Sequence, residues 1–162
     1  MKVRKNPGML FARAHEAHAS GDIVQAFELY QEGAVQNDQA SQNNLATFYE
    51  SGLGTRKNLK LAKKWYLAAW RNKPAAFIAL NIAELCLKRK KRNQAIRWLR
   101  RAIALGDGDA ALALAKLYLG ERKFGCLGHA KRLLSCAMTS QSISPDALEE
   151  ARCLYKELNK SA

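Results

Sequence analysis

The sequence predicts an all-α protein, and three observations lead to this prediction. Only three prolines and ten glycines interrupt its 162 residues, and 48% of the residues are hydrophobic, which is enough for a continuous core. Alanine, leucine, lysine and arginine are abundant, and these residues favour helix over sheet. Apolar residues recur at helical spacing in successive stretches that are joined by short polar turns. We therefore expect antiparallel helix hairpins.

The hairpins recur at intervals of roughly 33 to 38 residues, which is the signature of a helical repeat. We predict four repeats followed by a capping helix, with approximate bounds 8–38, 40–75, 76–108 and 109–140 for the repeats and 144–160 for the helix. The last segment begins with Ser144 and Pro145, which suit the N-cap and the first position of a helix. A capping helix is what the terminal repeat of such an array requires.

Each repeat contains small residues where its two helices would cross, and large residues between them that would fill the gaps on the neighbouring helix. We expect Trp65 and Trp98 to be buried anchors between consecutive hairpins, and Cys86 to be a core residue. In chain order, the pattern is formed by Ala14, Ala17, Ala26, Leu29, Tyr30 and Gly33; by Leu45, Ala46, Tyr49, Ala62, Trp65, Tyr66 and Ala69; by Ile82, Ala83, Cys86, Ala95, Trp98 and Ala102; and by Leu114, Ala115, Tyr118, Ala130, Leu133 and Ala137.

The second repeat carries a specific motif, Leu45-Ala46, Tyr49, Gly52-x-Gly54, Ala62, Trp65-Tyr66 and Ala68-Ala69. With this motif, residues 41–76 resemble the Sel1-like repeat, a variant of the tetratricopeptide repeat. The third repeat departs from the pattern, because the basic run Lys88 to Arg92 replaces its Gly-x-Gly loop. The resemblance implies a right-handed α-solenoid that forms one domain over residues 1–162. It also implies an adaptor that binds proteins or peptides, since stacked hairpins make a curved surface.

The resemblance places the first helix of each repeat on the concave surface. Asparagine amides on such a surface can both donate to and accept from a peptide backbone. A small basic member of this family also suggests a binder of one cognate partner, such as a toxin-neutralising protein or a regulator of secretion. The partner-binding residues that the layout implies are Phe11, His15, His18, Asn43, Asn44, Thr47, Glu50, Phe77, Asn81, Glu84 and Lys116.

The net charge of +13 is distributed unevenly along the chain. Residues 14–50 contain six acids and no Lys or Arg, whereas residues 51–101 contain fifteen Lys or Arg and one acid, Glu84. Such an asymmetry favours a partner of opposite charge, here an acidic protein or peptide. The predicted basic patch consists of Lys60, Lys64, Lys88, Arg89, Lys90, Lys91, Arg92, Arg97 and Arg101.

Two alternatives for the basic residues stay open. Segment 56–101 could bind nucleic acid without sequence specificity by neutralising phosphates, and Trp65, Trp70 and Trp98 could stack on bases. Against this, the sequence contains no recognised nucleic-acid module, and the acidic residues 14–50 would repel a nucleic-acid backbone. The basic run could also be only a solvated turn.

The sequence contains no signature of an enzyme. His15 and His18 are three residues apart, but no third metal ligand is evident beside them. The spacing of Cys126, His129 and Cys136 matches no zinc pattern, so we expect these three to be buried structural residues. We therefore predict no catalytic residue, no metal and no cofactor. The absence of a secretory signal and of a long apolar segment predicts a cytoplasmic protein without membrane contact, whose four cysteines are free thiols.

Overall fold

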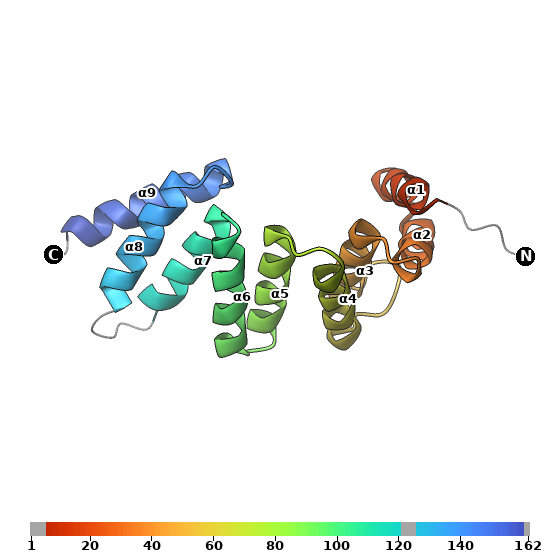
Figure 1. Cartoon of the computed structure of the whole chain (residues 1–162), viewed down its shortest axis with the longest axis horizontal. Coiled ribbons are helices and arrows are strands. Elements are labelled where there is room, and N and C mark those ends of the chain that lie inside the picture. Colours follow the sequence, from red (N-terminus) through yellow and green to blue (C-terminus); the bar gives the residue numbers. More distant parts are fainter. Residues whose placement is uncertain (1–5, 121–125, 161–162) are drawn as a thin grey trace, which may run out of the picture. The chain divides into compact units, whose positions relative to one another are not determined.

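The computed structural model describes residues 6–120 and 126–160, and this part of the chain forms nine α-helices and no named strand (Figure 1). The helices are α1 (Pro7–Ala19), α2 (Ile23–Val35), α3 (Gln39–Ser51), α4 (Leu59–Asn72), α5 (Ala76–Lys88), α6 (Arg92–Ala104), α7 (Gly108–Leu119), α8 (Cys126–Thr139) and α9 (Pro145–Lys160). The predicted all-α class, with four hairpins and a terminal helix, is confirmed. The right-handed turn of the whole array stays a prediction.

The helices form two compact units, which we call the N-terminal unit (residues 1–74, with α1 to α4) and the C-terminal unit (residues 75–162, with α5 to α9). Each unit contains two helix pairs, and each pair corresponds to one of the repeats expected from the sequence, although α1, α3 and α7 each begin one residue before the approximate bounds. The prediction that residues 1–162 make a single domain stays a prediction.

The second helices of the four hairpins share one register. Each has a buried alanine, a large buried residue four positions later, and a buried glycine or alanine seven positions later, which is the spacing of one helix face. The alanines are Ala26, Ala62, Ala95 and Ala130; the large residues are Tyr30, Tyr66, Leu99 and Leu134; and the last positions are Gly33, Ala69, Ala102 and Ala137.

The prediction that Trp65 and Trp98 are buried anchors is wrong. Both indoles are only half-buried, and the residue that follows each of them, Tyr66 or Leu99, occupies the centre of the packed face. Each indole also contacts a cation, since Lys64 Nζ lies 5.7 Å from the ring centroid of Trp65 and Arg101 Cζ lies 4.3 Å from that of Trp98. The tryptophans therefore lie at the edge of the helix face, where their rings cover the core beneath basic side chains.

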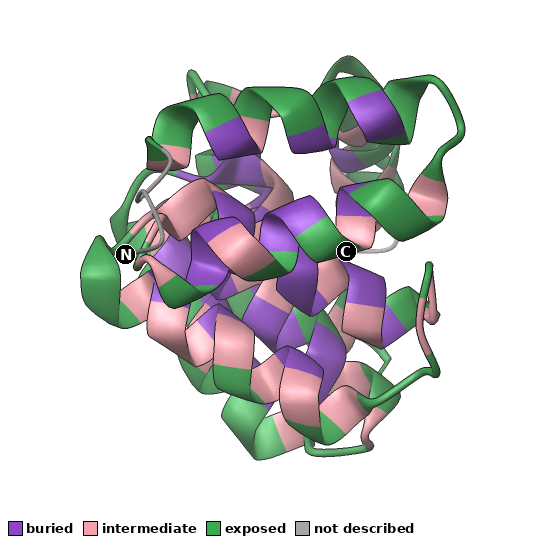
Figure 2. Cartoon of the chain, turned by 90° about the vertical axis from the view of Figure 1, so that its right-hand side faces the viewer, coloured by how far each residue is buried: buried purple, intermediate pink, exposed green. Residues whose placement is uncertain are grey.

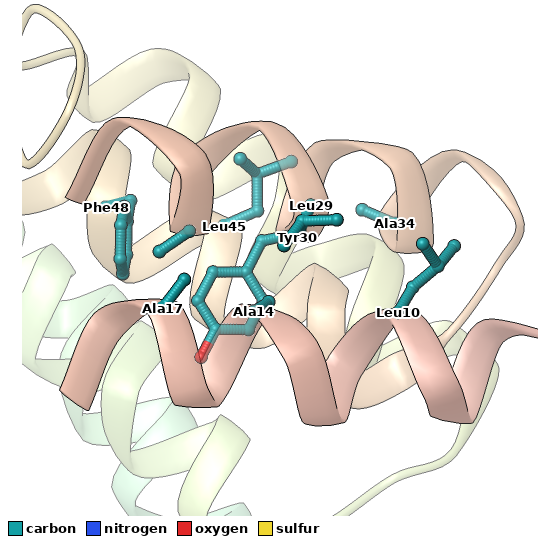
Figure 3. Packing of buried hydrophobic residues seen from close by; sticks show 9 residues of the cluster. Leu10, Ala14, Ala17, Leu29, Tyr30, Ala34, Leu45 and Phe48 are labelled. Carbon is teal, nitrogen blue, oxygen red and sulfur yellow. The ribbon is translucent and has the colours of Figure 1, made fainter. Parts of the chain in front are cut away.

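The core of the N-terminal unit lies between α1, α2 and α3. Figure 3 shows Leu10, Ala14 and Ala17 of α1 facing Leu29, Tyr30 and Ala34 of α2, with Leu45 and Phe48 of α3 beside them. The rings of Tyr30 and Phe48 meet edge to face at 5.2 Å between centroids.

The approach of α2 to α3 requires a glycine at position 33. A Cβ at Gly33 would lie 2.8 Å from the Cβ of Ser41, which is closer than two such atoms pack. The other three hairpins have alanine at this position, so the close crossing is particular to α2 and α3.

In the C-terminal unit, α9 covers the last hairpin. Ala151 is buried against α7 and α8, and Leu154, Tyr155 and Leu158 are partly buried against the same cluster. Exposed residues cover most of the remaining surface of α9. Along the helices nearest the viewer in Figure 2, buried residues likewise recur between exposed ones, so one side of each helix is buried. Helix α9 thus has one apolar stripe and a polar outer face, as a capping helix requires.

The structure also tests the expected burial of the cysteines and of His129. Cys86 is buried in α5 as predicted, and all four cysteines are free. His129 and Cys136 are exposed on α8, so the expectation of buried structural residues there is wrong. The apolar face of α8 is carried by Ala130, Leu134 and Ala137, and His129 and Cys136 flank it, each one residue from a buried alanine.

Candidate functional site

The predicted partner-binding residues of α1 lie over aromatic side chains of the N-terminal unit. Phe11 is half-buried, with its ring centroid 6.1 Å from that of Tyr30 and 6.2 Å from that of His15. The exposed ring of His18 meets Phe48 at 5.2 Å. His15 and His18 therefore present imidazoles at the surface, each resting on an aromatic ring.

The predicted residues of α3 are mostly engaged inside the same unit. The carboxylate of Glu50 is buried and accepts a hydrogen bond of 2.8 Å from the Tyr66 hydroxyl. The Thr47 hydroxyl lies 3.0 Å from the same Tyr66 oxygen, and the Asn44 amide donates to the Ala40 carbonyl in its own helix at 2.9 Å. Glu50 is therefore an internal acceptor and not the surface contact that we predicted, because α4 packs over it.

The remaining predicted residues belong to the C-terminal unit. Phe77 is half-exposed near the start of α5, Asn81 is half-buried, and Glu84 is exposed. Lys116 of α7 is exposed, and its Nζ lies 2.7 Å from Glu150 Oε1 of α9, so this lysine forms a surface ion pair with the capping helix.

A cavity of about 330 Å³ opens between the first helices of this unit. We call it the first-helix pocket, and it is lined by Leu87 of α5, by Asp109, Leu112, Ala113, Lys116 and Leu117 of α7, and by Ala147 of α9. Its wall is apolar apart from Asp109 and Lys116. Both charged groups also contact the α9 segment, since Asp109 Oδ1 accepts a hydrogen bond of 3.0 Å from the Ser144 hydroxyl.

Of these residues only Lys116 was predicted from the sequence. The missed signal is the composition of α7, which has apolar residues on more than one side. Leu114 and Ala115 are buried in the hairpin, while Leu112, Ala113 and Leu117 line the pocket on another side of the helix. A helix that is apolar around most of its circumference has a second apolar surface to cover.

The basic run forms the turn between α5 and α6. The N–H of Lys90 donates to the Leu87 carbonyl and the N–H of Lys91 to the Cys86 carbonyl, both at 2.8 Å, which closes α5 in a Schellman motif. This motif requires a left-handed residue, and Lys90 adopts it with φ of 56°. The matching turn of the first hairpin has Gly21 with φ of 87°, so Lys90 occupies a conformation that favours glycine.

The run divides into a structural part and an exposed part. Arg92 is half-buried, and its guanidinium donates a hydrogen bond of 2.8 Å to the Leu117 carbonyl in the last turn of α7. Lys90 and Lys91 are exposed. Of the other patch residues, Lys88, Arg97 and Arg101 are exposed and Arg89 is half-buried in the C-terminal unit, whereas the exposed Lys60 and Lys64 belong to the N-terminal unit.

Within residues 6–120 and 126–160, no three His, Cys, Asp or Glu side chains are grouped closely enough to hold a metal ion. No helix in the same part of the chain has the length and apolar character of a membrane span.

The repeated hairpins, with small residues at the helix crossings and a helix over the last hairpin, define a helical-repeat protein. The family model of the Sel1 repeat matches residues 17–38, 39–71 and 86–107. The chain therefore carries Sel1 repeats, as the motif in the second repeat predicted. The third match contains the basic run, so the run is a variation within a recognisable repeat.

One relative is similar to the chain in sequence, and two solved structures are similar to it in fold. The chain is 30% identical over 82 residues to a putative Sel1-like repeat-containing protein of Acanthamoeba polyphaga mimivirus, in a match that covers 51% of the chain and only 15% of that relative. The fold of the present chain is similar to that of a Sel1 repeat protein from Oxalobacter formigenes. The TM-score is 0.72 and the sequence identity is 19%, and the match covers 94% of this chain and 73% of the other. A thermophilic TPR protein of Thermus thermophilus is also similar, with a TM-score of 0.66, 20% identity, and coverage of 96% and 82%.

Proposed function

We propose that the chain is a non-catalytic module that binds a protein partner, and that an apolar side chain of this partner enters the first-helix pocket. Repeats of the Sel1 and tetratricopeptide type generally mediate protein–protein interaction. The observation that carries the proposal is the apolar pocket itself, because it lies between first helices of successive hairpins and can receive a side chain that the hairpins do not supply. Full burial of one leucine or phenylalanine side chain there would contribute about 1.5 to 3 kcal/mol.

The charge of the C-terminal unit favours an acidic partner. Lys90 and Lys91 are exposed at the α5–α6 turn, which directly follows Leu87 of the pocket wall. Cations beside an apolar contact accelerate the encounter with an acidic protein, and salt screens this effect. The proposed role is that of an adaptor or of a dedicated binder, such as a toxin-neutralising or secretion-associated regulator.

The pocket can be tested by blocking it. Ala113 is half-buried in the pocket wall, so Ala113→Glu places a charge in an apolar site without leaving a cavity in the core. The matched control is Ala104→Glu, at the exposed last residue of α6. We expect the tagged wild type and the control to capture the same nuclease-resistant protein from native lysate, and Ala113→Glu to capture it at least about 10-fold less. Equal capture by Ala113→Glu, with normal helical circular dichroism, would contradict the proposed pocket.

Nucleic-acid binding is the second candidate function, because fifteen of the 27 Lys and Arg residues lie in segment 51–101. Nuclease treatment distinguishes the two candidates, since a nucleic-acid partner or bridge is lost and a protein partner stays. Salt adds a second criterion, because each phosphate contact contributes about 0.7 to 0.9 to the slope of log affinity against log salt.

The contribution of the basic run is tested with Lys90→Glu combined with Lys91→Glu. Arg92 is kept, since its bond to the Leu117 carbonyl holds α6 against α7 and its loss would disturb the fold. We expect the double variant to capture the protein partner more slowly and more weakly at low salt. Unchanged capture would mean that the run is a solvated turn.

A further inference from the structure

The C-terminal unit has a second cavity, of about 400 Å³, between α6, α7 and α8. We call it the arginine pocket, and its lining consists of Arg100 and Ile103 of α6, Leu114 and Tyr118 of α7, and His129, Arg132 and Leu133 of α8. Leu114 and Tyr118 lie on the side of α7 opposite to Ala113 and Lys116, given 100° of rotation per residue. The arginine pocket is therefore separate from the first-helix pocket.

The walls of this cavity combine cations with apolar side chains. Arg100 donates a hydrogen bond of 3.1 Å to the Tyr118 hydroxyl, which directs its guanidinium toward α7. The Tyr118 ring lies 5.9 Å from the His129 ring, and Arg132 stands on the α8 side. Ile103, Leu114 and Leu133 supply the apolar part of the wall, and none of the described residues that line the cavity is acidic.

This combination selects the chemistry of a ligand. A guanidinium has five N–H donors in a planar fork, so one bond to a tyrosine leaves donors for a carboxylate. Arginine and carboxylate form short, charge-assisted bonds that are about twice as strong as neutral ones. The apolar wall would in turn exclude water from a hydrocarbon or aromatic group attached to that carboxylate.

We propose that the arginine pocket binds an acidic segment of a protein partner, in which an aspartate or glutamate stands beside a bulky apolar side chain. Charge complementarity favours an acidic protein segment, because both arginines of the pocket are exposed and because the exposed Arg97 and Arg101 of α6 add positive charge beside it. This inference goes beyond the proposed function, since it concerns a different cavity and does not depend on the first-helix pocket.

The chemistry is tested first with 3-phenylpropanoate, which carries one carboxylate on an aromatic arm. We expect saturable changes in the amide NMR signals of Tyr118, Leu133 and their neighbours in the ¹⁵N-labelled full chain, with a Kd of about 1 mM. The neutral 3-phenylpropanamide and the armless propanoate should each bind at least about 5-fold more weakly, since each lacks one of the two contacts. Equal binding of the amide, or no saturable change, would overturn the proposal.

The variants Arg100→Gln and Arg132→Gln each remove one guanidinium from the pocket, and both side chains are exposed, so the fold is retained. Each should weaken binding of 3-phenylpropanoate by about 5- to 10-fold. Arg71→Gln is the matched control, because it removes the same charge from an exposed position of α4 that does not line the pocket, and it should change binding less than about 2-fold. An equal loss in all three variants would show only non-specific attraction and would overturn the site.

A peptide then tests the proposed source of the carboxylate. A blocked hexapeptide with a central Phe-Glu pair between aspartates should bind more tightly than 3-phenylpropanoate. The counterpart with a Phe-Gln pair should bind more weakly than the Phe-Glu peptide. If the peptide binds no better than the small acid, the protein partner is the wrong occupant. Ala113→Glu should leave all of these affinities unchanged, so failure of the first-helix pocket and failure of the arginine pocket are distinguishable.

Discussion

The two units use the same hairpin register with different interiors. At the central position of the second helices, the N-terminal unit has Tyr30 and Tyr66, whereas the C-terminal unit has Leu99 and Leu134. The tyrosines bring polar groups into the core: the Tyr66 hydroxyl donates to the buried Glu50 carboxylate. Both cavities described above belong to the unit with the aliphatic interior. One repeat geometry therefore accommodates a polar internal network in one unit and an aliphatic interior with cavities at its surface in the other.

Leu99 provides the largest expected effect. Leu99→Ala should lower the free energy of unfolding by about 2 to 5 kcal/mol, because the side chain is fully buried and leaves a cavity. Trp98→Ala should cost less, about 1 to 2 kcal/mol, since the indole is only half-buried at the helix edge. Urea denaturation followed by circular dichroism measures both. An equal or larger loss for Trp98→Ala would place the tryptophan in the core after all.

The tyrosines of the N-terminal unit give the next effect. Tyr66→Phe should cost about 1.5 to 3 kcal/mol, because it removes a donor from a buried carboxylate. The Tyr30 hydroxyl is buried without a hydrogen-bond partner among the described residues, so Tyr30→Phe should be neutral or slightly stabilising. Urea denaturation of the two variants compares them directly. If both variants lost a similar amount of unfolding free energy, the hydrogen bond between Tyr66 and Glu50 would not contribute more to stability than the Tyr30 hydroxyl.

The α5–α6 turn should give a gain in stability. Lys90→Gly should raise the free energy of unfolding by about 1 kcal/mol, because glycine adopts a positive φ without a steric cost. Lys91→Gly is the control with the same loss of charge, and it should not stabilise, since Lys91 has φ of −97°. Thermal unfolding of the pair shows which residue carries the strain. If both variants behaved alike, charge rather than backbone conformation would explain the result.

Asp107 provides the smallest effect, as a change with pH. Burial is the main reason why the pKa of Asp107 is raised, and Asp109 adds to it, while the Ala110 and Asp109 amides oppose it. The native state therefore binds this proton more tightly than the unfolded state, so stability falls as the pH rises from 3.8 through the raised pKa. Asp107→Asn keeps an N-cap acceptor and should remove this slope. Urea titrations between acid and neutral pH would contradict the assignment if the slope persisted.

The helices and their order follow from local patterns in the sequence. Helical periodicity marks the apolar faces, and local groups close the ends: the Asp22 and Asp38 carboxylates accept backbone N–H groups at the starts of α2 and α3. Ser144 and Pro145 likewise begin α9, where the Ser144 carbonyl accepts the first helical bond. These features depend on residues within a few positions of each other, so they are visible without a fold. The motif of the second repeat added the family.

Helix packing, in contrast, determines which residue of a neighbouring pair faces the core and where cavities open. Trp65 and Tyr66 are about 100° apart on α4, and both fit the apolar arc, so periodicity alone cannot choose between them. Glu50 became internal because α4 packs over it, and a carboxylate at the end of α3 carries no local sign of this burial. The first-helix pocket and the arginine pocket each combine side chains from three helices, so their geometry depends on helix packing that no local pattern specifies.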